Sequence, residues 1–119
     1  MKKKVQLAVV FAASLGLASL ALADKPGADA EGLWTYIQKT SPYTTWGFWP
    51  DHQGLQEGAA PHAPLHKVYV NDAGLKSAHA PANDGTIIVK ENIGKDMELK
   101  ALTVMYKVKG YNPEAGDWF

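Results

Sequence analysis

Residues 86–108 read TIIVKENIGKDMELKALTVMYKV, and this stretch predicts two β-strands joined by a polar turn. The first strand, residues 86–92, is built on Ile87, Ile88 and Val89, because β-branched residues favour a buried strand. Residues 94–98 turn the chain. The second strand, residues 99–108, alternates apolar and polar side chains, which is typical of a strand with one buried face. Its inward positions are Leu102, Val104, Tyr106 and Val108.

The elements before this pair are shorter. Residues 65–71 alternate in the same way and predict a third strand. Residues 30–39 predict a short helix with Asp29 as its N-cap, because Leu33, Tyr36 and Ile37 fall on one helical face. Residues 72–79 predict one or two helical turns capped by Asn71 or Asp72. The expected fold is therefore mainly β (α+β), an antiparallel sheet with one or two short helices.

Two further segments complete this outline of the chain. Residues 40–64 contain four prolines and three glycines together with Trp46, Phe48 and Trp49, and they predict an irregular segment that is packed down. At the other end, Trp118 and Phe119 look like the start of another strand. Residues 81–85, PANDG, predict a tight turn between the helical turns and the first long strand.

The first 23 residues resemble an export signal. Three lysines, Lys2, Lys3 and Lys4, precede an almost wholly apolar run, and Ala21-Leu22-Ala23 is a small-x-small cleavage site. The alternative is an uncleaved membrane anchor, since the apolar run is nearly long enough to span a bilayer. With cleavage, residues 24–119 form a single exported domain, most simply in a bacterial periplasm, with no membrane contact after processing.

Composition excludes several classes of protein. The 119 residues contain no cysteine, which excludes a disulfide scaffold, a thiolate metal site, a cysteine nucleophile and thioether-linked haem for this sequence. The formal net charge is zero and there is no arginine, which argues against nucleic acid as a partner. No Gly-rich phosphate loop or G-x-S-x-G motif is present.

The histidines are one candidate for chemistry. His62 and His66 lie four apart, a spacing that would pair metal ligands on a helix, but Pro64 between them disfavours a helix. In an extended segment they share a face about 13 Å apart, at about 3.3 Å per residue. With His52 and His79 the chain offers four imidazoles for copper or zinc. The alternative is that all four are ordinary surface or loop-packing histidines.

Lys90 is the second candidate. It follows Ile88 and Val89 in a strand of apolar residues, and alternation places it on the same face as Ile88. A lysine beside a buried face can act as a nucleophile or a covalent attachment point. The alternative is a strand-end lysine whose ammonium reaches water and pairs with Glu91 or with an acid on a neighbouring strand.

Several segments in order resemble the cytochrome P-460 family. They are residues 68–72 (VYVND), 84–92 (DGTIIVKEN) and 102–119 (LTVMYKVKGYNPEAGDWF), with Pro61-His62, WGFWP at 46–50 and Gly58 upstream. The resemblance implies an antiparallel β fold, export, often a homodimer, and descent from c-type haem proteins that oxidise hydroxylamine or handle nitric oxide. In members with the unusual haem a lysine is cross-linked to the porphyrin, and Lys90 stands at the matching position.

The chain also departs from that family. Its members continue through another strand to a C-x-x-C-H motif that attaches and ligates haem c, and this sequence has none of those three residues. Enzymatic activity is therefore left open, and three interpretations remain. The chain is a truncated P-460 protein, a haem-free periplasmic module that binds a metal ion or small ligand, or an assembly domain that pairs through the sheet edge near Trp118.

Overall fold

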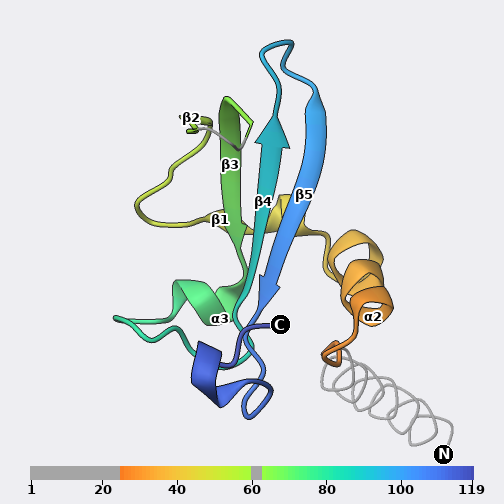
Figure 1. The fold of residues 1–119 in the computed structure, drawn as a ribbon, viewed down its shortest axis with the longest axis vertical. Coiled ribbons are helices and arrows are strands. Elements are labelled where there is room, and N and C mark those ends of the chain that lie inside the picture. The colour runs from red at the N-terminus through yellow and green to blue at the C-terminus, as the bar shows by residue number, and fades with distance from the viewer. Residues whose placement is uncertain (1–24, 60–62) are drawn as a thin grey trace, which may run out of the picture.

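The protein is an open antiparallel sheet with short helices, as expected (Figure 1). This computed structural model describes residues 25–59 and 63–119. The signal segment expected at residues 1–23 and His62 lie outside these ranges. The strands are β1 (Gly47–Phe48), β2 (Gln56–Glu57), β3 (Leu65–Val70), β4 (Ile87–Ile93) and β5 (Leu99–Tyr106), in the spatial order β1-β3-β4-β5 with β2 also paired to β3.

The three long strands match their predicted positions within one or two residues. β4 is the central strand, with β3 on one side and β5 on the other, and Tyr69, Val89 and Val104 form one rung across all three. The irregular segment 40–64 contains more order than its composition indicated. Its two short strands, β1 and β2, escaped prediction because two residues are too few to show an alternation.

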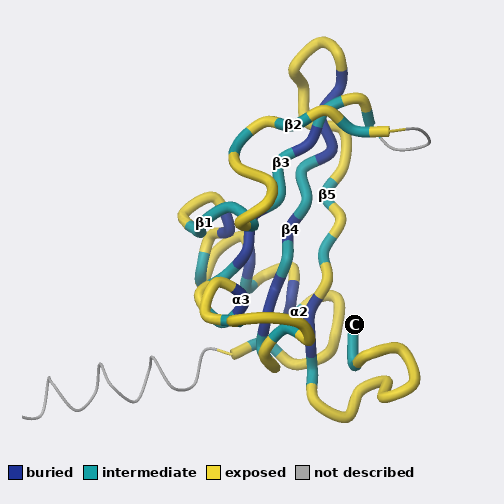
Figure 2. The backbone as a smooth tube through the Cα atoms, turned by 90° about the vertical axis from the view of Figure 1, so that its left-hand side faces the viewer, coloured by how far each residue is buried: buried dark blue, intermediate teal, exposed yellow. Residues whose placement is uncertain are grey.

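Alternation gives the sheet two distinct faces. The core face carries Tyr69, Ile87, Val89 and Tyr106, which pack against Leu33 and Ile37 from the helical segment. The opposite face, called the outer face below, carries the alternate residues. Figure 2 shows buried residues along β3 and β4, while most of β5 is exposed. The outer-face residues of the three long strands are His66, Val68, Val70, Ile88, Lys90, Asn92, Ala101, Thr103 and Met105.

The helix that covers the core face begins where the sequence predicted. The carboxylate of Asp29 accepts a hydrogen bond from the backbone N–H of Gly32 at 2.6 Å and caps α2 (Ala30–Thr35). The helical path continues as a π-helix, Tyr36–Thr40, so the predicted helix is present in two forms. Leu33 and Ile37 are buried as their spacing indicated. None of the helices in the described ranges is long and apolar enough to cross a bilayer.

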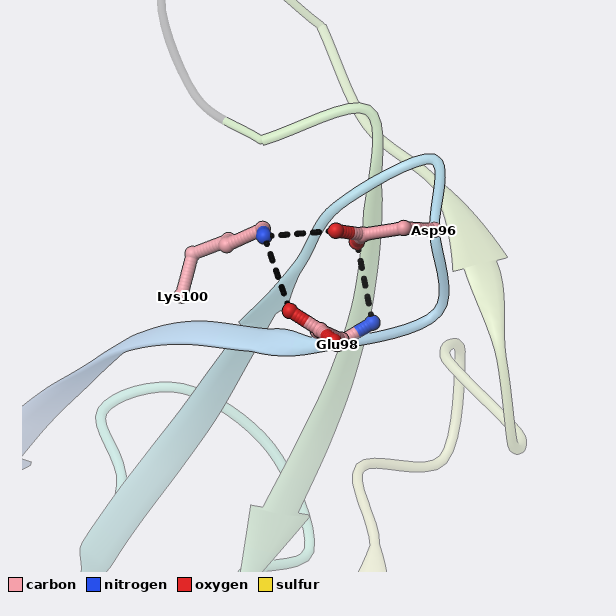
Figure 3. A network of polar contacts seen from close by, with 3 residues as sticks. All are labelled: Asp96, Glu98 and Lys100. Atoms are coloured by element: carbon pink, nitrogen blue, oxygen red, sulfur yellow. Dashed lines mark hydrogen bonds and ion pairs between the residues drawn. The ribbon is translucent and has the colours of Figure 1, made fainter.

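The turn between β4 and β5 is held by exposed polar groups (Figure 3). The Lys100 ammonium lies 2.8 Å from the carboxylate of Asp96 and 3.4 Å from that of Glu98. Asp96 also accepts a hydrogen bond from the backbone N–H of Glu98 at 3.1 Å. These pairs raise the pKa of Lys100 and lower that of Asp96 through their hydrogen bond. Because both side chains are exposed, they shape the turn more than they stabilise the fold.

The last residues return along the far end of β5. Tyr106 and Phe119 exchange two backbone hydrogen bonds, at 3.0 and 2.8 Å, and Trp118 pairs with Lys107. Where the sequence predicted the start of another strand at Trp118 and Phe119, the structure has one isolated bridge and no further strand in the described ranges. Their side chains also join the two faces, since Phe119 packs on the core and Trp118 lies beside Lys107.

Asn71 links the end of β3, helix α3 (Asp72–Leu75) and the start of β4. Its Oδ1 accepts hydrogen bonds from the backbone N–H groups of Gly74 at 3.2 Å and Ile87 at 3.0 Å. Its Nδ2 donates to the carbonyl of Gly85 at 2.9 Å. One amide side chain therefore caps α3 and satisfies two backbone groups of the chain entering β4, which places the loop after α3 against the outer face.

We expect Asn71→Ala to lower the free energy of unfolding by about 2–4 kcal/mol, because a helix cap is lost and partly buried backbone groups lose their partner. Urea denaturation of the full chain measures this. Asn112→Ala is the matched control, since Asn112 is exposed and its side chain makes no hydrogen bond to any described residue. Equal losses for the two variants would contradict the structural role of Asn71.

Candidate functional site

The outer face carries a cavity beside α3 and the loop that follows it. Its volume is about 580 Å³, within the range of small-molecule sites, which runs from about 300 to 1,000 Å³. The sheet contributes Ile88, Met105 and Lys107 to its wall. The loop after α3 and two tryptophans, Trp49 and Trp118, complete the lining. The cavity is therefore assembled from five separate parts of the chain.

Lys107 is the lysine in the wall of this cavity. Its side chain is only 8% exposed, and its ammonium lies 5.7 Å from the centroid of the Trp118 ring, within reach of a cation–π interaction. The ion pairs found in residues 25–59 and 63–119 involve Lys76 and Lys100, so no described carboxylate lies within 4.0 Å of the Lys107 ammonium. Asp51 also contributes to the cavity wall, without pairing with Lys107.

Lys90 lies on the outer face in the middle of β4, as predicted. Its neighbours across the sheet are Val68 on β3 and Thr103 on β5. One alternation step along β4 leads to Ile88, which lines the cavity, so Lys90 lies beside the cavity rather than in its wall. The alternative ion pair with Glu91 does not form, because Glu91 points to the core face and accepts a hydrogen bond from the Tyr43 hydroxyl at 2.7 Å.

Tyr43 and Glu91 form the main polar contact of the core face. Burial raises the pKa of the Tyr43 hydroxyl, and the adjacent Glu91 carboxylate raises it further. The Tyr43 ring also packs edge-on against Tyr69, with centroids 5.2 Å apart. This pair therefore holds the segment after the π-helix against the sheet. Nothing in the sequence spacing indicated it, since the two residues lie 48 positions apart.

His66 lies farther along the outer face, and its ring lies next to that of His52. The two ring centroids are 5.8 Å apart. The predicted pair of His62 and His66 stays a prediction, because His62 lies outside the described ranges. His79 is separate from this pair, since its exposed ring belongs to the cavity wall. Among the residues that the structure describes, no three His, Asp or Glu side chains cluster as a metal site.

The imidazole of His66 is poorly placed to carry a charge. The residue is 9% exposed, and its Nδ1 is buried without a hydrogen-bond partner among the described residues. Burial lowers the pKa of His66, and the positive charges of Lys90 and His52 lower it further. The neutral imidazole is thus the favoured form, and it is also the form that binds metal ions.

The residues present do not fit a covalently attached haem. Thioether attachment needs cysteine, and this sequence contains none. The outer face offers lysine, histidine and methionine side chains instead. We therefore assign no chemical step of this chain to haem iron.

Comparison of the chain with protein-family profiles, with curated proteins and with solved structures finds no match.

Protonation of His66 should destabilise the fold at low pH. A lowered pKa means that stability is fully present above the unfolded value of 6.5 and is lost as the pH falls through the folded value. We expect the free energy of unfolding to fall more steeply between pH 7 and pH 4.5 in the native chain than in His66→Leu. Urea denaturation across this range measures the difference.

His79→Gln is the control for this experiment, because His79 is exposed. It should keep the native pH dependence. The interpretation fails if His66→Leu and the native chain lose stability in parallel as the pH falls, since His66 would then contribute no linked proton.

Proposed function

We propose that this chain is an exported cytochrome P-460-like domain without a covalent haem site of its own, which binds a small ligand on its outer face. In this proposal it derives from c-type haem proteins that handle hydroxylamine or nitric oxide. The observation that carries the proposal is the position of Lys90, at the centre of the outer face and beside a cavity. The family's cross-linked lysine occupies the matching sequence position.

The surroundings of Lys90 support a role in ligand contact. Its charge has no carboxylate partner within ion-pair distance among the described residues, and apolar Val68 and Ile88 flank it on the same face. A lysine used only for solubility needs neither feature. Its charge also acts on His66, whose pKa it lowers. The same resemblance supports export to the periplasm and a homodimer as parts of the proposal.

Haemin titration of the full chain tests whether the outer face retains complementarity to a porphyrin. We expect a shifted Soret band that is lost on acid–acetone extraction, because no thioether bond can form. Lys90→Met should weaken haemin binding by about tenfold, the loss expected for one charged contact.

Lys67→Met is the matched control for Lys90→Met, since Lys67 is also half-buried in the sheet but belongs to the core face. It should leave haemin binding unchanged. The proposal fails if haemin gives no Soret shift, or if the two lysine substitutions have the same effect.

A second candidate function is favoured by the His52 and His66 rings. Two imidazoles on one zinc ion hold their ring centroids about 5–6 Å apart, given Zn–N distances of about 2.0–2.1 Å, and the observed separation is 5.8 Å. His66 is kept neutral by burial, as a metal ligand requires. We propose as the alternative a haem-free module that binds copper or zinc through this pair.

Calorimetric titration with Zn²⁺ and with Cu²⁺ tests this alternative. His52→Ala and His66→Ala should each weaken binding by at least roughly tenfold, while His79→Ala should have no effect. His62→Ala reports whether His62 is a third ligand. Unchanged affinity in His52→Ala and His66→Ala would exclude the site.

A further inference from the structure

We infer that the cavity between β4, β5 and the loop after α3 binds a small organic monocarboxylate, with the Lys107 ammonium as its counter-ion. This inference goes beyond the proposed function, because it holds whether or not the domain is of the P-460 type. It rests on three features of the cavity: a lysine of low exposure without an ion-pair partner among the described residues, an apolar wall, and the sign of the charges on the outer face of the sheet.

The first feature is the environment of Lys107. Its aliphatic stem is buried and its ammonium faces the Trp118 ring, with no carboxylate of the described residues within 4.0 Å. The ammonium nitrogen itself keeps contact with solvent, because the one buried side-chain nitrogen or oxygen without a partner among the described residues is Nδ1 of His66. Within the described residues, the Trp118 ring at 5.7 Å is the contact found for this charge, and the rest of its surroundings is open to solvent or to a ligand. A ligand carboxylate in the cavity would supply the missing partner.

The second feature is the apolar wall. Ile88 on β4 and Met105 on β5 are cross-strand neighbours on the outer face. Both line the cavity beside Lys107. Trp49 and Trp118 supply aromatic surface at the sides. A ligand that fills this space needs an apolar body, because small-molecule sites combine apolar walls with a few polar groups that set orientation. Simple inorganic anions would leave most of the wall uncovered.

The third feature is the distribution of charge. The outer-face positions of β3, β4 and β5, together with Lys107 just beyond β5, include two lysines and no carboxylate. The positive face therefore favours an anion. Asp51 in the cavity wall repels any anion, so the single charge of the ligand would have to lie toward Lys107 and away from Asp51.

The available donors also distinguish a carboxylate from a phosphate. Phosphate sites typically use several N–H donors or the forked guanidinium of arginine. This sequence has no arginine, and the cavity wall contains one lysine. A single ammonium matches a singly charged carboxylate better than it matches a phosphate.

Isothermal titration of the full chain with benzoate, benzamide and inorganic phosphate tests the inference. Benzoate and benzamide have the same shape and differ in charge. We expect benzoate to bind at least about tenfold more tightly than benzamide, because only benzoate can form a charged contact with the Lys107 ammonium. Inorganic phosphate should give no saturable heat. Lys107→Met should reduce benzoate affinity to that of benzamide.

Lys109→Met is the matched control, because Lys109 is exposed and lies two residues farther along the chain. It should leave benzoate affinity unchanged. If Lys107→Met fails to fold, the comparison of benzoate with benzamide on the native chain decides alone. Equal binding of the two ligands, stronger binding of phosphate than of benzoate, or no saturation by benzoate up to roughly 10 mM would overturn the inference.

Discussion

Strand β4 is hydrogen-bonded along both sides, and its alternation decides which side chain reaches which face of the sheet. Ile87 and Val89 enter the core, where Leu33 and Ile37 cover them. Ile88 and Lys90 consequently point to the outer face. A slip of one residue in the pairing would bury Lys90 and expose Val89, so the cost of burying an unpaired charge fixes the register. The position of the cavity follows from that register.

The sequence predicted the parts of this arrangement that local patterns control. The faces of β3, β4 and β5, the Asp29 cap and the buried helical residues all follow from alternation or helical spacing. Alternation with the predicted inward positions Tyr106 and Val108 puts Lys107 on the opposite face, with Met105. It could not show that this face becomes a cavity wall, because Trp49, the loop after α3 and Trp118 reach it only through tertiary contacts. The approach of His52 to His66 escaped prediction for the same reason.

Lys100 and Lys107 lie at opposite ends of the β5 region, and their side chains differ in exposure and in pairing. Lys100 is exposed near the turn and pairs with Asp96 and Glu98, whose positions in sequence already suggested a solvated turn. Lys107 follows β5 at the other end and is almost fully buried without such a partner. The first charge is paired and exposed to water, whereas the second lies beside the Trp118 ring in the wall of the cavity. The two residues are of the same type, one in β5 and one just after it, but they differ in what they can contribute to function.

The outer-face positions of the sheet carry positive charge, and this bears on which ligand is favoured. Glu91 is retained on the core face by the Tyr43 hydroxyl, while Lys90 and Lys107 belong to the outer face. A metal ion at His52 and His66 would meet the repulsion of Lys90, which already lowers the pKa of His66. An anion meets no such opposition on the sheet itself. An anion bound beside these lysines would weaken the repulsion felt at His66, so anion and metal binding on the outer face would be thermodynamically coupled with a positive sign.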